Sequence, residues 1–560
     1  MKKINTKLKI LFLIAVFGVF TAISYDLNQY NVYTTPDFTT NIFFSELVSD
    51  EYTLKYCNDY NVSIFGGRTF ARAKDEGCAT HASMHGYILI LGIFRMISDS
   101  LIYFVNPLFA IISLIFFYKI SRLFFNEKTS ILGVILLSFS ASFFYYSVLY
   151  FNNIVLLGFL LGGIYFFFRL LQTNATKYYL LFPLFLSIAI WIRYPVVIFS
   201  IPLVIGFFSK EYRKNFYLLN RDENRITIKN SNEKKLLLSA FMFLIMLLPL
   251  LLLNIHLYGH PLGWVTTPEM QLSYHIYKGL SPEQTENTSI VPFYGFDIMF
   301  NNLKYILKLN SIISIFFIIS IVYFLVNKNR RGEIFFCNSF WILMSITVFY
   351  FLFYLGNTWT GYYYTSFSIN TSLARYLLPV YAIMILLSSY IISSLFKYDW
   401  VRINKILTIT LIIILLTAYI TFNLNLVVNE DLGLNSIKSS VSKYVYRQNI
   451  ILDVVPEKDA VIFTKYSDKW IFPERITAIY VAFPPETRME QTSILVKKLL
   501  IEGVPVYFVD EDWLQKISGR ANVFDNFTTK EYLSEFEKND MSQRLVSKDV
   551  YKIELKNNTQ

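Results

Sequence analysis

Residues Leu236–Tyr258 read LLLSAFMFLIMLLPLLLLNIHLY, an apolar run without any Asp, Glu, Lys or Arg. A helix needs about 20 such residues to cross the hydrocarbon core of a bilayer. Similar runs recur along the 560-residue chain, which is 54% hydrophobic and only 16% charged, whereas soluble domains are usually about 25% charged. One aqueous core cannot bury so many apolar residues. The composition therefore excludes a soluble enzyme, a fibrous protein and a disordered protein.

The apolar runs predict an α-helical polytopic membrane protein with about eleven transmembrane helices, spread over residues 1–422. The first run follows a short basic start and lacks a small-residue cleavage site, so we expect a retained helix. Two long polar loops, residues 26–85 and 259–308, interrupt the series. The expected spans are Ile10–Tyr25, Leu101–Leu123, Ile131–Tyr150, Ile154–Leu171, Tyr179–Ile192, Pro195–Phe208, Leu236–Tyr258, Ile312–Val326, Ile334–Leu355, Tyr376–Phe396 and Ile406–Phe422.

The net charge of +11 indicates how the chain is oriented in the membrane. If the N-terminus is cytoplasmic, the expected inner loops together carry more Lys and Arg than the longer outer loops, as the positive-inside rule requires. The clearest inner loop is Lys210–Lys235. An odd number of spans then places both long polar loops and the C-terminal region outside the cell membrane. The charge therefore predicts membrane lipids, and no nucleic acid, as partners.

The C-terminal region, residues 423–560, differs in composition from the rest. Its 18 Lys and Arg and 20 Asp and Glu give a net charge of −2, which leaves +13 for residues 1–422. Strand-like runs at Ala460–Thr464, Thr477–Val481 and Val504–Val509 surround an amphipathic helix near Glu486–Glu502. This order predicts a small extracytoplasmic α/β accessory domain.

Three cysteines exclude a disulfide framework. Cys57 and Cys78 share the first outer loop, and a bridge between them depends on that loop facing an oxidising compartment. Polar residues gather in the outer loops and are scarce in the expected spans. Chemistry at the outer membrane face is therefore favoured over transport, because transporters usually place polar groups at mid-depth.

Several short motifs occur in a fixed order along the membrane part. They are Pro36-Asp37 and His81-Ala-Ser-Met-His85-Gly86-Tyr87 in the first outer loop, Trp191-Ile-Arg193-Tyr194-Pro195 at a helix junction, Asn254 with Tyr258-Gly259-His260-Pro261-Leu262 before the second outer loop, and Arg375-Tyr376-Leu377-Leu378-Pro379 at a late helix. Together they resemble the GT-C membrane glycosyltransferases, in particular the aminoarabinose-transferase and protein O-mannosyltransferase type. The resemblance covers most of residues 1–422 and does not extend to residues 423–560.

The resemblance implies transfer of a sugar from a polyprenyl-phosphate donor to a glycan, lipid or protein acceptor at the outer face. Asp37 matches the loop acid of the family, which would act as general base on the acceptor. Cationic side chains would stabilise the phosphate of the leaving group. Arg193 and Arg375 are the main candidates for this role, with Arg68 and Arg72 as further candidates.

Five more residues of the first outer loop are candidates for substrate contact: His81, His85, Tyr87, Asp75 and Glu76. His81 and His85 are spaced to share a helix face and hold a metal, although no third ligand is evident. Contact with a phosphate or sugar is the alternative. No cofactor is predicted with certainty, and the sequence leaves open whether a divalent metal takes part.

The sequence departs from the family pattern at two places. Phe38 follows Asp37 where relatives carry Glu, and Asn152-Asn153 stands where relatives often carry an acid. These changes put a metal held by two loop acids in doubt. Competing interpretations are that Asp37 is a helix N-cap and that the arginines only extend to the membrane interface. The alternative functions are a lipid-linked sugar transporter and a catalytically silent envelope-assembly protein.

Overall fold

The computed structural model gives a predominantly helical chain with two small sheets. The residues that it describes are 6–30, 32, 35–57, 70–75, 77–81, 85–173, 175–208, 233–261, 263, 296–326, 338–355, 369–395, 405–430, 433–465, 467–479, 488–511, 528–547 and 549–556.

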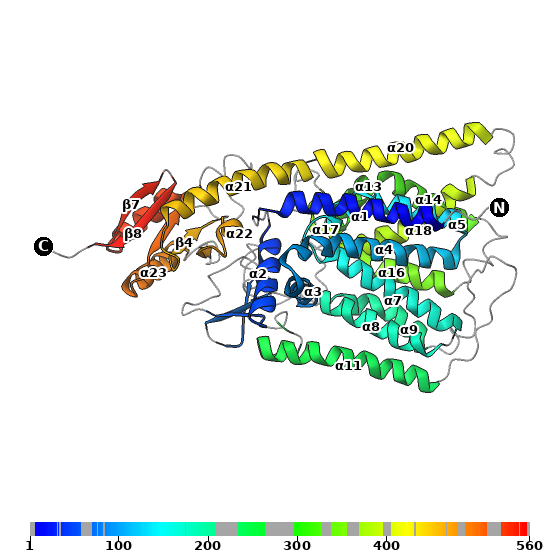
Figure 1. Cartoon of the computed structure of the whole chain (residues 1–560), viewed down its shortest axis with the longest axis horizontal. Helices are drawn as coiled ribbons and strands as arrows, with labels where there is room; N and C mark the ends of the chain where they lie inside the picture. Colours follow the sequence, from blue (N-terminus) through cyan, green and yellow to red (C-terminus); the bar gives the residue numbers. More distant parts are fainter. Residues whose placement is uncertain are drawn as a thin grey trace.

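Long apolar helices run side by side and form one bundle (Figure 1). Their bounds are α1 Thr6–Asn28, α4 Ile102–Phe124, α5 Glu127–Ser138, α6 Ala141–Ser147, α7 Asn153–Thr173, α8 Thr176–Ile192, α9 Val196–Phe208, α11 Glu233–Tyr258, α14 Ser311–Val326, α16 Asn338–Leu355, α18 Leu378–Leu395 and α20 Lys405–Asn429. The expected apolar runs therefore form helices, and helices α4, α7, α8 and α18 supply much of the buried apolar core.

Within the described residues, five helices are long and apolar enough to cross a membrane, or up to seven if each of two bent helix pairs forms one span. Shorter apolar helices, among them α8, α9 and α18, come in addition. The chain is a multi-pass membrane protein. The count of about eleven spans stays a prediction.

One expected span is wrong as a single helix. Residues 131–150 form α5 and α6, which meet at a bend of 63°. The side chain of Asn423 accepts a hydrogen bond from the backbone N–H of Ala141 at 2.9 Å, and this bond satisfies a donor that the break leaves without a helical partner. The expected span from Tyr376 likewise begins later, because the short helix α17 (Ser372–Tyr376) precedes α18.

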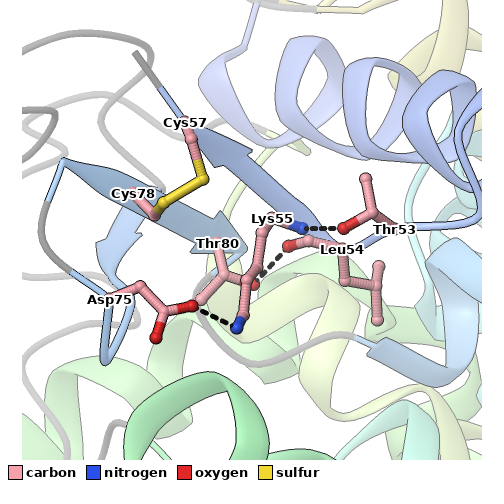
Figure 2. The surroundings of a disulfide bond; sticks show 7 residues. All are labelled: Thr53, Leu54, Lys55, Cys57, Asp75, Cys78 and Thr80. Carbon is pink, nitrogen blue, oxygen red and sulfur yellow. Dashed lines mark hydrogen bonds and ion pairs between the residues drawn. A yellow bond between two sulfur atoms is a disulfide. The ribbon is translucent and has the colours of Figure 1, made fainter. Parts of the chain in front are cut away.

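The first polar loop folds against one end of the bundle. It contains α2 (Pro36–Asp50), then the strands β1 (Lys55–Cys57), β2 (Phe70–Arg72) and β3 (Cys78–His81), which pair antiparallel in the order β1-β3-β2. Cys57 and Cys78 are partners in the β1–β3 register and form a disulfide, and an ion pair between Lys55 and Asp75 at 2.5 Å lies beside it (Figure 2). The bridge considered from the sequence is therefore present.

Two amphipathic helices were not expected from the sequence. Helix α3 (His85–Ile97) follows the β1-β3-β2 sheet directly, and α13 (Phe296–Leu309) precedes α14. Each has exposed apolar residues on one face and buried residues on another. Both are shorter than a typical membrane span.

The C-terminal region begins with α21 (Leu434–Val454), which follows α20 and leads away from the bundle (Figure 1). A five-stranded sheet follows in the order β5-β4-β6-β8-β7. Its elements are β4 Val461–Thr464, α22 Asp468–Ile471, β5 Ile476–Ile479, α23 Arg488–Ile501, β6 Val506–Val509, α25 Thr529–Lys538, β7 Met541–Ser547 and β8 Val550–Leu555. The three predicted strands and the predicted helix are confirmed, whereas α21, α25, β7 and β8 were missed. The domain boundary at residue 422 stays a prediction.

The C-terminal region contacts the helix that carries Asp37. The hydroxyl of Thr39 on α2 donates a hydrogen bond to the backbone carbonyl of Lys469 on α22. One turn further along α2, the ring of Phe43 packs against Phe472, with ring centroids 4.7 Å apart. The first polar loop and the C-terminal sheet therefore lie at the same end of the bundle, opposite the marked N-terminus (Figure 1).

Candidate active site

Asp37 lies in the first turn of α2 and is not its N-cap. The cap is Thr35, whose side-chain oxygen accepts a hydrogen bond from the backbone N–H of Phe38 at 3.4 Å. The N-cap interpretation of Asp37 is therefore wrong. Its carboxylate is instead held by Arg375, with 2.8 Å between Oδ2 and Nη1. The Asp37 side chain keeps 21% of its surface exposed, so it remains accessible beside this ion pair.

Helix α2 is fixed against α3 by close packing. A Cβ added at Gly92 of α3 would lie 2.4 Å from a methyl carbon of Val48 on α2, so only glycine allows this approach. At the same contact, Arg95 of α3 forms an ion pair with Glu46 of α2 at 2.7 Å. These contacts fix the direction of α2, and therefore the place of the Asp37 side chain.

Arg375 enters the site from α17, a short helix with a well-defined start. Thr371 caps α17 by accepting a hydrogen bond from the backbone N–H of Ala374 at 3.0 Å. The guanidinium of Arg375 also donates to the hydroxyls of Ser372 and Tyr376, at 3.2 and 3.3 Å. Its guanidinium carbon lies 4.7 Å from the centre of the Phe151 ring. Arg375 is thus held in one orientation by several partners.

Arg193 provides a second buried guanidinium next to Arg375. It lies at the C-cap of α8, and its guanidinium carbon is 3.5 Å from the centre of the Tyr376 ring. Its Nε and Nη1 atoms are buried and find no hydrogen-bond partner among the described residues. A buried donor without a partner is costly in a folded protein, so these two atoms indicate a place for an external acceptor.

Tyr376 lies between the two arginines. Burial alone would raise the pKa of its phenol, but the neighbouring charges of Arg375 and Arg193 lower it to about 8. Tyr376 belongs to the motif that begins at Arg375, but no role was predicted for it from the sequence. Tyr354 of α16 was missed entirely, although its ring centre lies 5.8 Å from the guanidinium carbon of Arg193. Both were hidden among the many aromatics expected at membrane interfaces.

The structure brings other motif residues together behind the arginines. The hydroxyl of Tyr194 donates to the side-chain oxygen of Asn254 at 2.9 Å, and the amide of Asn254 donates to the carbonyl of Pro261 at 2.8 Å. Gly86 lies so close to the end of α8 that a Cβ there would be 2.7 Å from the backbone of Trp191. The motifs around Gly86, Arg193 and Asn254 therefore meet in one place.

Three of the predicted substrate-loop residues are buried in packing contacts. The ring of His85 is hydrogen-bonded to the hydroxyl of Tyr258 at 3.0 Å, and that hydroxyl donates to the backbone carbonyl of His81. Burial lowers the pKa of His81 to about 3, which keeps its ring neutral. Tyr87 is fully buried and donates to the side-chain oxygen of Asn106 at 3.1 Å. None of the three contacts Asp37 or the arginines in the hydrogen bonds and ion pairs of the described residues.

Asp75 is paired elsewhere, on the small sheet of the first polar loop. Asp75 forms the ion pair with Lys55 beside the disulfide (Figure 2). The backbone of Arg72 belongs to β2, on the same small sheet. Arg68 and Glu76 lie outside the described residues.

Two solved structures match this chain over nearly all of its length. The crystal structure of ArnT from Cupriavidus metallidurans bound to undecaprenyl phosphate matches with a TM-score of 0.54 at 10% sequence identity, over 98% of this chain and 98% of that one. The apo oligosaccharyltransferase of Archaeoglobus fulgidus matches with a TM-score of 0.52 at 12% identity, over 93% of this chain and 72% of that one.

The fold is that of the GT-C glycosyltransferases. The sequence profile described as dolichyl-phosphate-mannose-protein mannosyltransferase matches residues 80–253, which include Arg193. No curated protein sequence matches the chain. The resemblance predicted from the motifs is confirmed, and it now rests on the fold as well as on the sequence.

At the two positions that depart from the GT-C pattern, this chain has uncharged side chains. Phe38 is buried, and its ring packs against Phe151 with centroids 4.4 Å apart. The amide of Asn152 donates to the backbone carbonyl of Ile192 at 3.4 Å. Among the described residues, no three His, Cys, Asp or Glu side chains are grouped so that they could hold a metal. Asp37 therefore has Arg375 as its charged partner at this position.

Proposed function

We propose that this chain transfers a hexose or pentose from a polyprenyl-phosphate-linked donor to an acceptor at the outer face of the cell membrane. The observation that carries the proposal is the grouping of Asp37, Arg375 and Arg193, in which two buried guanidinium nitrogens of Arg193 have no acceptor within the part of the chain that the structure describes. A carboxylate next to two cations provides both a base and a phosphate-binding site. The solved ArnT structure with undecaprenyl phosphate supports a lipid phosphate as the ligand of such a fold.

In the proposed reaction, an acceptor oxygen or nitrogen forms a bond to the anomeric carbon of the sugar. The bond between that carbon and the phosphate oxygen breaks, and its electron pair leaves with the polyprenyl phosphate. Asp37 takes the proton of the acceptor as general base, a role that typically contributes about 10²- to 10⁴-fold in rate. The glycan, lipid or protein nature of the acceptor stays open.

The two arginines would stabilise the charge that develops on the departing phosphate. Arg193 offers Nε and Nη1, and Arg375 is already oriented by its hydrogen bonds to Ser372 and Tyr376. Guanidinium groups match phosphate oxygens in geometry, and they act strongly where water is excluded. The prenyl tail would then lie along the apolar helices that continue from the site into the membrane.

Two observations support placing this chemistry on the outer side. The Cys57–Cys78 disulfide belongs to the first polar loop, and disulfides persist mainly in oxidising compartments. At the opposite end of the bundle, Lys9 of α1 pairs with Glu127 of α5, near the basic residues Lys119 and Arg122 of α4. Basic residues concentrate on the cytoplasmic side of membrane proteins, which favours a cytoplasmic N-terminus and an outer C-terminal region.

The proposal is tested by sugar transfer from labelled polyprenyl-phosphate donors in membranes that contain the full chain. We expect Asp37→Asn to lower the transfer rate by about 10²- to 10⁴-fold, because the amide cannot accept the proton. Asp26→Asn is the matched control, since Asp26 pairs with Lys438 on the surface and is expected to keep wild-type transfer.

Two results would contradict the proposal. Full transfer by Asp37→Asn would remove Asp37 as the base. No transfer from any donor, together with movement of the labelled lipid across vesicles, would identify a lipid-linked sugar transporter instead.

A further inference from the structure

We propose that Asn41 and Asn153 form a subsite that accepts hydrogen bonds from the hydroxyl groups of the donor sugar. The subsite deepens the sugar transfer proposed above and rests on it. Three observations carry it: two side-chain oxygens that are buried without a donor, the contacts of their segments with the candidate site, and the chemistry of a polyprenyl-phosphate sugar.

Each asparagine has a buried side-chain oxygen that lacks a donor. Asn41 and Asn153 keep only 1% and 2% of their surface exposed. In both, Oδ1 is buried and has no hydrogen-bond donor among the described residues. The Asn41 amide has a defined orientation, because its nitrogen donates to the backbone carbonyl of Tyr150 at 3.1 Å. Buried acceptors without a donor are costly, so the two oxygens indicate a place for an external donor.

Asn41 lies on the helix that carries Asp37. The two residues are four positions apart in α2, which puts their side chains on the same face of the helix, one turn apart. The hydrogen bond from Asn41 to Tyr150 joins α2 to the turn between α6 and α7, and Asn153 is the first residue of α7. The two acceptor oxygens therefore belong to segments that are in direct contact.

The turn between α6 and α7 also contacts the segments that carry the two arginines. The ring of Phe151 lies 4.7 Å from the guanidinium carbon of Arg375. The amide of Asn152 donates to the backbone carbonyl of Ile192, which directly precedes the second arginine of the site. Asn106 of α4 holds the turn by donating to the backbone carbonyl of Phe151 at 2.9 Å. The turn is therefore fixed beside the proposed phosphate site.

The chemistry of the donor assigns the missing hydrogen bonds to its sugar. Phosphate oxygens accept hydrogen bonds, and the prenyl tail has no polar hydrogen. Each sugar hydroxyl supplies an O–H donor, and the sugar is attached directly to the phosphate. In this arrangement the arginines donate to the phosphate, and the asparagine oxygens accept from the sugar. A buried site of this kind discriminates against a ligand that lacks the matching hydroxyl.

The proposal is tested by comparing two ligands that differ only in the sugar. Binding to the full chain is measured for undecaprenyl phosphate and for its mannose, glucose and arabinose derivatives, and the sugar derivative that wild type binds most tightly is used for the variants. We expect Asn153→Ala to weaken binding of that derivative by about 3- to 10-fold, the value of one hydrogen bond, and to leave binding of undecaprenyl phosphate unchanged.

The ratio of the two affinities separates recognition of the sugar from structural damage. Asn41→Ala should lower the same ratio, even if loss of its bond to Tyr150 weakens both ligands together. Asn28→Ala is the matched control, because Asn28 is also buried and its amide donates to the backbone carbonyl of Ser24 at 2.7 Å. We expect this control to keep the wild-type ratio.

Deoxy sugars identify the hydroxyl that is bound. Among monodeoxy derivatives of the chosen sugar donor, at least one should bind wild type about 3- to 10-fold more weakly than the parent donor. The same derivative and the parent should bind Asn153→Ala equally, because the variant has already lost the acceptor.

Three results would overturn the subsite. An equal loss for both ligands in Asn153→Ala would give this residue a structural role. No loss of donor binding, together with a raised KM for the acceptor in transfer, would assign the oxygen to an acceptor hydroxyl. No binding of either ligand by wild type would contradict sugar transfer itself, and the subsite with it.

Discussion

The buried charges in the membrane bundle and in the C-terminal sheet are used in different ways. In the sheet, the buried carboxylate of Glu511 accepts hydrogen bonds from the hydroxyl of Thr464, the backbone N–H of Lys465 and the hydroxyl of Ser467. Thr464 is the last residue of β4, and Lys465 and Ser467 follow it. Strand β4 pairs with β6, and Glu511 comes shortly after β6. In the bundle, Arg193 keeps two buried nitrogens without an acceptor among the described residues.

The difference separates a structural polar cluster from a site that is prepared for a ligand. A fully hydrogen-bonded buried charge stabilises one local arrangement and offers nothing to a substrate. A buried guanidinium with donors left over costs stability, and proteins retain such strain mainly where it serves function. The Glu511 cluster is therefore expected to affect stability alone, and the Arg193 pair to affect activity.

The largest effect that would separate the two regions is expected at Arg193. Arg193→Lys keeps the charge but loses the planar guanidinium that stacks on Tyr376. We expect the transfer rate to fall by about 10²- to 10³-fold, as for loss of a group that stabilises transition-state charge. The rate is measured with the labelled donor, and the melting temperature with the same preparation.

Losing Nε and Nη1 should cost little stability, because neither atom has an acceptor among the described residues. Any fall in melting temperature should come from the lost stacking on Tyr376. A matched control is Arg475→Lys, since all three guanidinium nitrogens of Arg475 donate to backbone carbonyls in the C-terminal region. Equal transfer by Arg193→Lys and wild type would remove the distinction drawn between the two regions.

Glu511→Gln is expected to produce the converse pattern. The glutamine side chain has one oxygen and one NH₂ group in place of the two carboxylate oxygens. Its NH₂ group would therefore face hydrogen-bond donors and could not accept from them. We expect a loss of about 1–3 kcal/mol in stability, the range for a buried polar group left without a suitable partner. Chemical denaturation of the C-terminal region measures this loss. Transfer by the remaining folded protein should stay at the wild-type rate, and a selective loss of transfer would assign Glu511 to the site.

A smaller effect is expected from the ionisation of Tyr376. Because the pKa of Tyr376 is lowered to about 8 in the folded protein, its phenol should ionise below the usual range for tyrosine, and tyrosinate absorbance detects this early ionisation. The lowered pKa favours the folded state only when the phenol is ionised. The resulting stability is complete above pH of about 10 and is lost as the pH falls through about 8.

Tyr376→Phe provides the control for this titration. The variant should lack the early tyrosinate signal and should show no gain of stability over that pH interval. An unchanged early signal would mean that another tyrosine titrates there and that Tyr376 does not lie between two effective cations.

Helices were predicted well from the sequence where apolar runs are continuous. Elements with many polar residues were predicted poorly. Helix α7 extends only slightly beyond the expected run of residues 154–171, because that run has no charged residue apart from Arg169. Helix α21 and the strands β7 and β8 were missed because few of their residues are buried and they lack a strong apolar pattern. Helix α13 was missed because it lies within the polar loop that the composition indicated.

The candidate site shows a similar limit. Asp37 and Arg375 were each selected from local motifs, yet they are separated by 338 residues, and their ion pair depends on how the fold brings Arg375 of α17 to the first turn of α2. No local pattern contains that contact. The histidines of the first loop had a suitable spacing for a site, but the fold buries them beside Tyr258, and the hydrogen bonds and ion pairs of the described residues do not join them to the arginines.

The central claim is that Arg193 and Arg375 form a site for a lipid phosphate. Binding of polyprenyl phosphate to the purified full chain tests it most directly, because this product is the same for every sugar and acceptor. The account predicts that wild type and Asp37→Asn bind it, and that Arg193→Ala weakens binding by about 10- to 100-fold, the value of one or two charge-assisted hydrogen bonds. Equal affinity of wild type and Arg193→Ala would contradict the account.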